Sequence, residues 1–229
     1  PGTRVALSDD EIQARLLEAT RSWSEQLVEV LSKTQPELPA ELHSLIRSCP
    51  VSYRERVSAL EAAADLEYLQ RLCAENSLLL RLIIDDASRE SGRMRLKLYV
   101  YQQAVTLSEV LPTLENFGLT VMGQHPYLVN QPDQVDLWIQ EFTVTHPAAR
   151  SMAAEELRQL FEDAFPRSWH GEVENDGFNR LVLSAAVGWR EAVLLRALCK
   201  YLLQTGLPFS QTYMEDILAQ YAPITRRLV

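Results

Sequence analysis

The sequence predicts an α+β fold, in which an antiparallel sheet with its own helices is flanked by mainly α-helical segments. Polar and apolar residues alternate between Arg93 and Tyr101, the period-2 pattern of a half-buried strand. Before and after this region, apolar residues recur at the spacing of an amphipathic helix. These patterns divide the chain into a helical segment at 1–76, an α+β module at 77–147 and a second helical segment at 148–229.

The composition argues against several classes of function. The 229 residues carry a formal net charge of −9 without a basic cluster, which argues against nucleic-acid binding. No apolar run approaches the roughly 20 residues that a membrane-spanning helix needs, and no signal peptide opens the chain. The three cysteines lack disulfide or metal-ligand spacing, as is typical of a reducing compartment, so we expect a cytoplasmic protein. The opening PGTR and the end at Val229 suggest a portion of something longer.

The first segment begins with two predicted helices. Ser8 to Glu11 is a capping box, in which the Glu side chain can return to the Ser8 backbone N–H. The helix that it opens should end near Lys33, and a short helix is expected around 37–47.

A longer helix should complete this segment. Ser52 and Glu55 form a second capping box, which would open a helix running toward Cys73. Asp65 could cap a fresh helix, which would bend the chain at that point.

The α+β module should begin with a buried strand at 78–84, because this branched apolar run is too short for a typical helix. A polar loop leads to the strand with strict alternation. We interpret its basic group, Arg93, Arg95 and Lys97, as a solvated strand face. One set of side chains should face a core and the other should face solvent or a partner: Met94, Leu96, Leu98 and Val100 in the first, Arg95, Lys97, Tyr99 and Tyr101 in the second.

A helix and two more strands should complete the module. Thr106 to Glu109 is a third capping box, and the helix after it should close at Gly118, a typical C′ glycine. Pro112 removes one backbone hydrogen bond inside this helix. Two strands are then expected, at 119–129 and 135–144.

The second segment should be helical. From Phe178 to Gln204 the chain is apolar nearly all round, which indicates burial or a partner surface. Gly188 would bend this helix, and Ser210 should cap a last one. An earlier helix presents one apolar face: Met152, Leu157, Leu160, Phe161 and Phe165.

A strand, a helix, two strands and a second helix make up most of a ferredoxin-like βαββαβ layout. The final strand is missing, and the strand at 78–84 could complete the sheet from the other end of the sequence. Packing of the 93–101 strand on the helix after Thr106 would place sheet on one side and helices on the other. This outline is that of an ACT-type module, a class in which small metabolites often bind between paired modules.

One stretch of the module carries a family resemblance. LSEVLPTLENFGLTVMGQHPYLV, followed by VDLWIQEF, resembles the large NAD-specific glutamate dehydrogenases of bacteria, in the portion amino-terminal to their catalytic domain. Two flanking stretches fit as well: SYRERVSALEAAADLEYL upstream and ENDGFNRLVLSAAVGWREAVLLRALCKYLLQTGLPFSQTY downstream. The resemblance implies a parent enzyme that converts glutamate to 2-oxoglutarate and ammonia with NAD and forms large homo-oligomers.

The residues themselves offer no catalytic or metal-binding site. The eight glycines contain no GxGxxG after a strand, so NAD would bind in the parent's catalytic domain and no cofactor is expected in this chain. His125, His146 and His170 have no partner at metal-ligand spacing. The resemblance therefore implies a non-catalytic regulatory or oligomerisation segment. The alternative is a free-standing ACT-type module that senses amino acids.

Two groups of residues remain as candidate binding or interface sites. The helix start at Thr106, Ser108 and Glu109 has free N–H groups that could hold a carboxylate or phosphate of a small-molecule effector, although an ordinary cap explains it too. The aromatic residues could anchor other domains or subunits of the same enzyme, or could be covered by the chain's own helices. This aromatic set is Tyr99, Tyr101 and Trp138. No nucleic-acid or membrane partner is expected.

Overall fold

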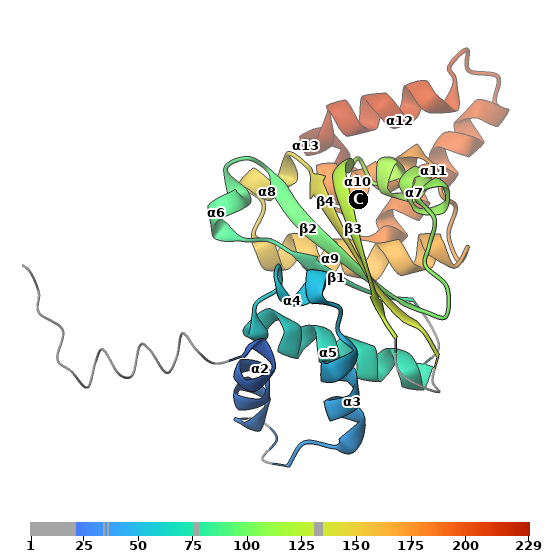
Figure 1. The fold of residues 1–229 in the computed structure, drawn as a ribbon. Helices are drawn as coiled ribbons and strands as arrows, with labels where there is room; N and C mark the ends of the chain where they lie inside the picture. Colours follow the sequence, from blue (N-terminus) through green and yellow to red (C-terminus); the bar gives the residue numbers. More distant parts are fainter. Residues whose placement is uncertain (1–21, 34, 36, 76–77, 131–134) are drawn as a thin grey trace, which may run out of the picture.

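The computed structural model describes residues 22–33, 35, 37–75, 78–130 and 135–229. A four-stranded antiparallel sheet lies at the centre of these residues, with helices on both of its faces (Figure 1). The strand order is β1-β2-β4-β3. The strands are β1 (Leu79–Ile83), β2 (Arg93–Tyr101), β3 (Thr120–Val129) and β4 (Leu137–Thr145). The α+β prediction is confirmed.

The sheet has the strand order of a ferredoxin-like unit, with one strand supplied from a different place in the sequence. In the βαββαβ layout the last strand lies beside the first. Here β1 takes that position, because it pairs antiparallel with β2, with Leu80 opposite Leu98. It precedes the unit along the chain, so the upstream strand completes the sheet as the sequence predicted.

The first face of the sheet forms the main hydrophobic core. Met94, Leu96 and Leu98 of β2 are buried against α7 (Leu107–Asn116) and α9 (Ala154–Trp169). Phe117, at the end of α7, meets Phe161 of α9 edge to face, with ring centroids 5.4 Å apart. The alternation read from the sequence therefore assigns the core-facing set correctly.

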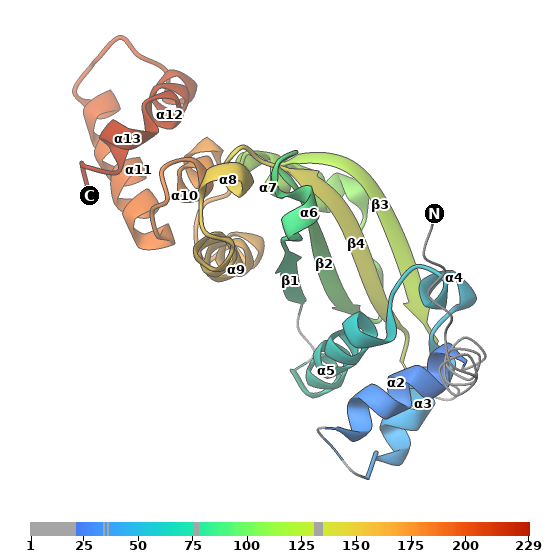
Figure 2. The same cartoon turned by 90° about the vertical axis from the view of Figure 1, so that its left-hand side faces the viewer.

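The second face of the sheet is covered as well, by helices from the first segment. These helices are α2 (Trp23–Ser32), α3 (Ala40–Ser48) and α5 (Ala59–Glu75), and Figure 2 shows α5 and α9 on opposite sides of the sheet. Tyr99 and Lys97 of β2 are both 0% exposed. The prediction of a solvated strand face holds for Arg93, which is exposed, but is wrong for Lys97. The prediction of helices on one side only is also wrong, because the chain's own helices enclose this face.

The free edge of β1 is closed by side chains from α9. Glu162 accepts a hydrogen bond from the Leu82 backbone N–H at 2.6 Å, and Arg158 donates one to the Leu82 carbonyl at 3.1 Å. An edge strand with unpaired backbone groups invites pairing with another chain. These two side chains occupy the groups of Leu82 that such pairing would use.

The first segment differs from its prediction in two places. The box at Ser8 lies outside the described residues, while α2 has its own capping box, formed by Ser22 and Glu25, and ends at Ser32. Ser52 lies inside the short helix α4 (Val51–Arg54) instead of capping a helix. Helix α5 is capped by Ser58, which accepts from the Glu61 N–H at 3.2 Å. It runs through Asp65 without a break, because that side chain is engaged elsewhere.

In the second segment, the single helix predicted from Phe178 to Gln204 is divided into separate helices. The chain leaves α10 (Arg180–Ser184), passes through Ala186 at φ 52° and enters α11 (Trp189–Gln204), with Gly188 as N-cap. Ser210 caps α12, as predicted. The remaining short elements and the last helices are α6 (Asp86–Arg89), α8 (Ala148–Ser151), η1 (Gly177–Asn179), α12 (Gln211–Gln220) and α13 (Ala222–Thr225). Figure 1 shows α11 to α13 at the opposite end of the molecule from α2 and α3.

Candidate functional site

The helix start predicted as an anion site forms an ordinary cap. Thr106 and Glu109 are exposed, and the Glu109 carboxylate accepts from the Thr106 backbone N–H at 2.8 Å and from its hydroxyl at 2.7 Å. These hydrogen bonds lower the pKa of Glu109. Ser108 lies 3.0 Å from the Thr106 hydroxyl. The anion at this helix start is supplied by the chain itself.

The aromatic candidates are not brought together. Tyr99 is buried and stacks on Tyr68 of α5, with centroids 4.7 Å apart. Tyr101 packs half-buried against the same core. Trp138 lies opposite Val100 in the β2–β4 pairing, and Val100 packs against the core on the other face of the sheet. Residues directly opposite in an antiparallel pair share a face, so Trp138 points away from the two tyrosines.

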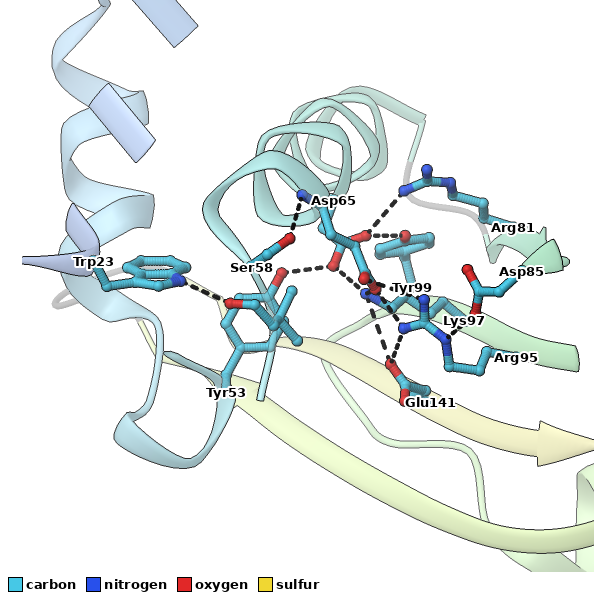
Figure 3. A network of polar contacts seen from close by, with 12 residues as sticks. Trp23, Tyr53, Ser58, Asp65, Arg81, Asp85, Arg95, Lys97, Tyr99 and Glu141 are labelled. Atoms are coloured by element: carbon cyan, nitrogen blue, oxygen red, sulfur yellow. Dashed lines mark hydrogen bonds and ion pairs between the residues drawn. The ribbon is translucent and has the colours of Figure 1, made fainter. Parts of the chain in front are cut away.

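The second face of the sheet holds a network of buried charges between α5 and β2 (Figure 3). Two acids of α5, Glu61 and Asp65, are four residues apart and therefore lie on one side of the helix. Two bases of β2, Arg95 and Lys97, are two residues apart and therefore lie on one side of the strand. The helical spacing of the two acids and the strand spacing of the two bases place these pairs of side chains opposite each other.

Asp65 is the centre of this network. It is 1% exposed, and its carboxylate accepts from Lys97 at 2.5 Å, from the Tyr53 hydroxyl at 2.6 Å and from the Tyr99 hydroxyl at 2.7 Å. Burial, together with the neighbouring carboxylate, raises the pKa of both tyrosines, so each remains a hydroxyl donor. Arg81 of β1 adds a longer contact at 3.4 Å.

Lys97 and Arg95 are held by further acids. The Lys97 ammonium also lies 2.5 Å from Glu61 and 3.7 Å from Glu141 of β4. Arg95 forms a two-pronged contact with Glu61, at 2.7 and 3.2 Å. Burial opposes ionisation of Glu61, but hydrogen bonds from Arg95 and Lys97 outweigh it and lower the pKa of Glu61. Both cations therefore have carboxylate partners.

This arrangement fastens α5 to the sheet and exposes no reactive group. A buried ammonium is tolerated only where charge partners and hydrogen bonds replace its water. Sequence reasoning missed Glu61, Asp65 and Tyr53. The available signal was the pair of acids at helical spacing upstream of two bases at strand spacing.

A second polar cluster attaches α11 to the body of the protein. The Arg196 guanidinium is 5% exposed and bonds both carboxylate oxygens of Asp176, at 2.8 to 3.0 Å. It also donates to the side chain of Asn179 at 2.8 Å and to the Glu174 carbonyl at 3.2 Å. In α12, Glu215 is buried beside Gly177, where an added Cβ would lie 2.3 Å from its carboxylate. These polar contacts, together with an apolar cluster around Phe178 and Leu195, hold α11 and α12 on the body of the protein.

The opposite side of α11 is apolar and faces outward. We call the exposed large apolar side chains from Leu194 to Val229 the outer apolar face. They account for 11 of the 15 exposed large hydrophobic residues of the described chain. On α11 their spacing is that of a helical stripe, formed by Leu194, Leu198, Tyr201 and Leu202. The rest follow in the α11–α12 link, in α12 and toward the end of the chain: Leu207, Phe209, Tyr213, Tyr221, Ile224, Leu228 and Val229.

Within the described residues, no group of three or more His, Cys, Asp or Glu side chains could hold a metal ion. No helix among them is both long and apolar enough to span a membrane.

Comparison with known proteins identifies the family of this chain. Residues 79–157 match the family model described as glutamate dehydrogenase, ACT3 domain, and residues 173–229 match the one described as glutamate dehydrogenase, helical motif 3. An NAD-specific glutamate dehydrogenase of Halomonas elongata is 37% identical over 222 residues, which is 95% of this chain. The chain belongs to the NAD-specific glutamate dehydrogenase family.

Two further relatives in this family agree with the assignment. The NAD-specific glutamate dehydrogenase of Pseudomonas aeruginosa is 32% identical over all of this chain, and that of Mycobacterium tuberculosis is 31% identical over 95% of it. The chain spans 14% of the length of each of the three relatives. The ACT3 match runs from β1 into the start of α9, and the helical-motif match contains the Arg196 cluster and the outer apolar face.

Proposed function

We propose that this chain is a non-catalytic segment of a NAD-dependent glutamate dehydrogenase and that it serves in the assembly and control of that enzyme. The parent enzyme would convert glutamate to 2-oxoglutarate and ammonia in the cytoplasm, with NAD bound in a separate catalytic domain. The names of the relatives and the two family descriptions support this parentage.

The outer apolar face is the observation that carries the assembly role. Eleven of the 15 exposed large apolar side chains of the described residues lie between Leu194 and Val229, and concentrated exposed apolar surface marks sites of contact. The relatives extend well beyond the match, which leaves 86% of each outside it (100 − 14). A surface in the same polypeptide meets its partner at an effective concentration of about millimolar. We therefore assign the outer apolar face to other domains of the same enzyme.

Charged substitutions on this face of the full-length enzyme test the assignment. Leu198→Glu combined with Tyr201→Glu should change the oligomeric mass in light scattering or lower the specific activity. The same pair in the 229-residue chain should leave its unfolding midpoint nearly unchanged, because both side chains are at least half exposed. Leu60→Glu, on the exposed side of α5 at 73% exposure, is the matched control and should leave assembly intact. A full-length double variant with native mass and activity would refute the proposal.

The non-catalytic part has its own test. The 229-residue chain, mixed with glutamate and NAD, should show no NADH formation at 340 nm above a blank. The full-length enzyme under the same conditions should show turnover. Measurable turnover by the chain alone would overturn this part of the proposal and leave the assembly role to be judged separately.

A further inference from the structure

A short segment between α9 and α10 contacts four helices at once. We call this segment, residues 174–179, the connector; the helix η1 forms its second half. It bonds α7 through Asn175, α9 through Asn179, and both α11 and α12 through Asp176. The family match for the ACT3 domain contains α7, and the match for helical motif 3 contains the connector, α11 and α12. The connector therefore lies where the two matched parts meet.

Asn175 joins the connector to α7. Its Nδ2 donates to the Thr113 hydroxyl at 2.9 Å, and Thr113 is 3% exposed. Its backbone carbonyl and its Oδ1 accept from the Nδ2 of Asn116, at 3.1 and 3.0 Å. Thr113 and Asn116 are three residues apart and therefore lie on one side of α7. The last turns of α7 thus hold Asn175 by both its side chain and its backbone.

Asp176, the next residue, joins the connector to α11 and α12. Arg196 of α11 bonds both of its carboxylate oxygens, and the side-chain amide of Gln211 in α12 lies 3.4 Å from Oδ2. Gln211 also donates to Glu215 at 2.8 Å, and Gly177 leaves the space that the Glu215 carboxylate occupies. Consecutive residues of the connector are therefore bonded to α7 on one side and to α11 and α12 on the other.

The link into α11 is held in a strained conformation. Ala186, between α10 and α11, has a φ of 52°, a left-handed value that is unfavourable for a residue with a Cβ. Such strain persists only where the surrounding contacts maintain it. A small rotation of α11 about this link would relieve the strain if the contacts of the connector weakened. The outer apolar face would turn with the helix, because its stripe lies on α11.

We propose that the connector couples the position of α7 to the orientation of α11 and α12. Chains of bonded side chains can carry coupling between distant elements. A displacement of α7 would move Asn175, and Asp176 would pass that movement to Arg196 and so to the outer apolar face. Asn175 and Asp176 act as positioning residues. The regulatory meaning of this coupling rests on the proposed function of the outer apolar face, whereas the coupling itself is a property of the 229-residue chain.

Amide hydrogen exchange of the 229-residue chain, followed by mass spectrometry, tests the coupling with two substitutions at Thr113. Thr113→Val keeps the shape of the side chain but removes the acceptor for Asn175, so exchange in α11 and α12 should rise about two- to tenfold, the effect of one lost hydrogen bond. Thr113→Ser keeps the hydroxyl and should exchange as the parent chain does. A role in packing alone predicts the reverse order, because Ser leaves a small cavity. Thr120→Val, at an exposed position of β3, is the matched control.

A double-mutant cycle separates coupling from two independent losses. In an Arg196→Lys chain, whose connector already holds α11 less firmly, Thr113→Val should raise exchange in α11 and α12 by less than about twofold. Independent sites would instead multiply the two single increases.

Asn175→Ala removes the side-chain contacts to α7 from an exposed position, so it gives the same test if Thr113→Val fails to fold. Its expected result is the same rise in α11 and α12. An increase confined to α7 and the connector would overturn the proposal, as would independent effects in the cycle or an equal increase across the sheet. The assembly test with Leu198 and Tyr201 can fail without changing this result.

Discussion

The second face of the sheet and the outer side of α11 combine the same kinds of residue in opposite arrangements. Between α5 and β2 the charged groups are buried: Asp65 and Lys97 lie 2.5 Å apart and are 1% and 0% exposed. Apolar helices of the first segment cover the rest of that face. On α11 the buried charge of Arg196 attaches the helix to Asp176, while Leu194 and Leu198 are about half exposed.

This difference distinguishes a sheet face that the chain's own helices cover from a helix side whose apolar residues are exposed. Among the described residues, the buried cations of the sheet face have carboxylate partners, and the helices α2, α3 and α5 pack over this face. Helix α11 uses charge for its own attachment and leaves its apolar stripe without cover. Burial of such a stripe would be favourable by about 25 cal/mol for each Å² removed from water. The proposed contact with other domains of the enzyme would draw its binding energy from the outer apolar face.

The largest predicted effect concerns the centre of the charge network. Asp65→Ala removes one of the two carboxylates that lie 2.5 Å from the buried Lys97 ammonium, and it removes the shared acceptor of the Tyr53 and Tyr99 hydroxyls. The free energy of unfolding should fall by about 3–5 kcal/mol, as measured by urea titration followed by circular dichroism.

Two comparisons sharpen this prediction. Asp85→Ala removes a half-exposed carboxylate at the edge of the same network and should cost less than about 1 kcal/mol. The double variant Asp65→Leu, Lys97→Met should be more stable than Asp65→Ala alone, because no buried charge is left unpaired. Equal losses in Asp65→Ala and Asp85→Ala would contradict the described burial.

The second prediction concerns the pH dependence of stability, which arises from His146 at the corner between β4 and α8. Burial lowers the pKa of His146 to about 4, while an unfolded histidine titrates near pH 6.5. Between these values the unfolded chain binds a proton that the folded chain does not. The stabilising contribution of neutral His146 should therefore be fully present above pH 6.5. The free energy of unfolding should fall by about 3 kcal/mol as the pH decreases to 4. Urea titrations across this range measure the slope.

Replacement of the imidazole isolates this contribution. His146→Asn keeps an acceptor for the Ala148 N–H but cannot titrate, so its stability should depend less on pH between 6.5 and 4. His170→Asn, at the exposed end of α9, is the matched control and should retain the slope of the parent chain. A slope unchanged by His146→Asn would assign the pH dependence to other groups.

The third prediction concerns the attachment of α11. Arg196→Lys keeps the charge but loses the planar fork that reaches both Asp176 oxygens and Asn179 together. The loss should be about 2 kcal/mol, with increased amide exchange in α11 and α12 and little change in the sheet. Arg190→Lys, at an exposed position of the same helix, should have almost no effect. A uniform increase in amide exchange across the sheet would show that α11 and α12 do not open separately from the body.

Local patterns predicted the elements, whereas contacts distant in sequence decided the sites. Alternation identified β2 and its core-facing residues, and caps at Thr106 and Ser210 placed two helix starts. Alternation does not say what covers the other face. The partner of Lys97 is 32 residues away, and that of Arg196 is 20 residues away. The break after Ser184 was also missed, because the positive φ of Ala186 leaves no mark in an apolar run.

The smallest effect gives the most direct test of the comparison, because it uses two adjacent leucines of α11. Leu195 is 3% exposed and packs on Phe178, whereas Leu194 is 51% exposed on the outer apolar face. Leu194→Ser should change the free energy of unfolding of the chain by less than about 0.5 kcal/mol, and Leu195→Ser should cost about 2–4 kcal/mol. In the full-length enzyme, by contrast, Leu194→Ser at the exposed position should impair assembly. If Leu194→Ser destabilised the isolated chain as much as Leu195→Ser does, the chain itself would cover the apolar stripe of α11. The outer apolar face would then not be free to contact the rest of the enzyme.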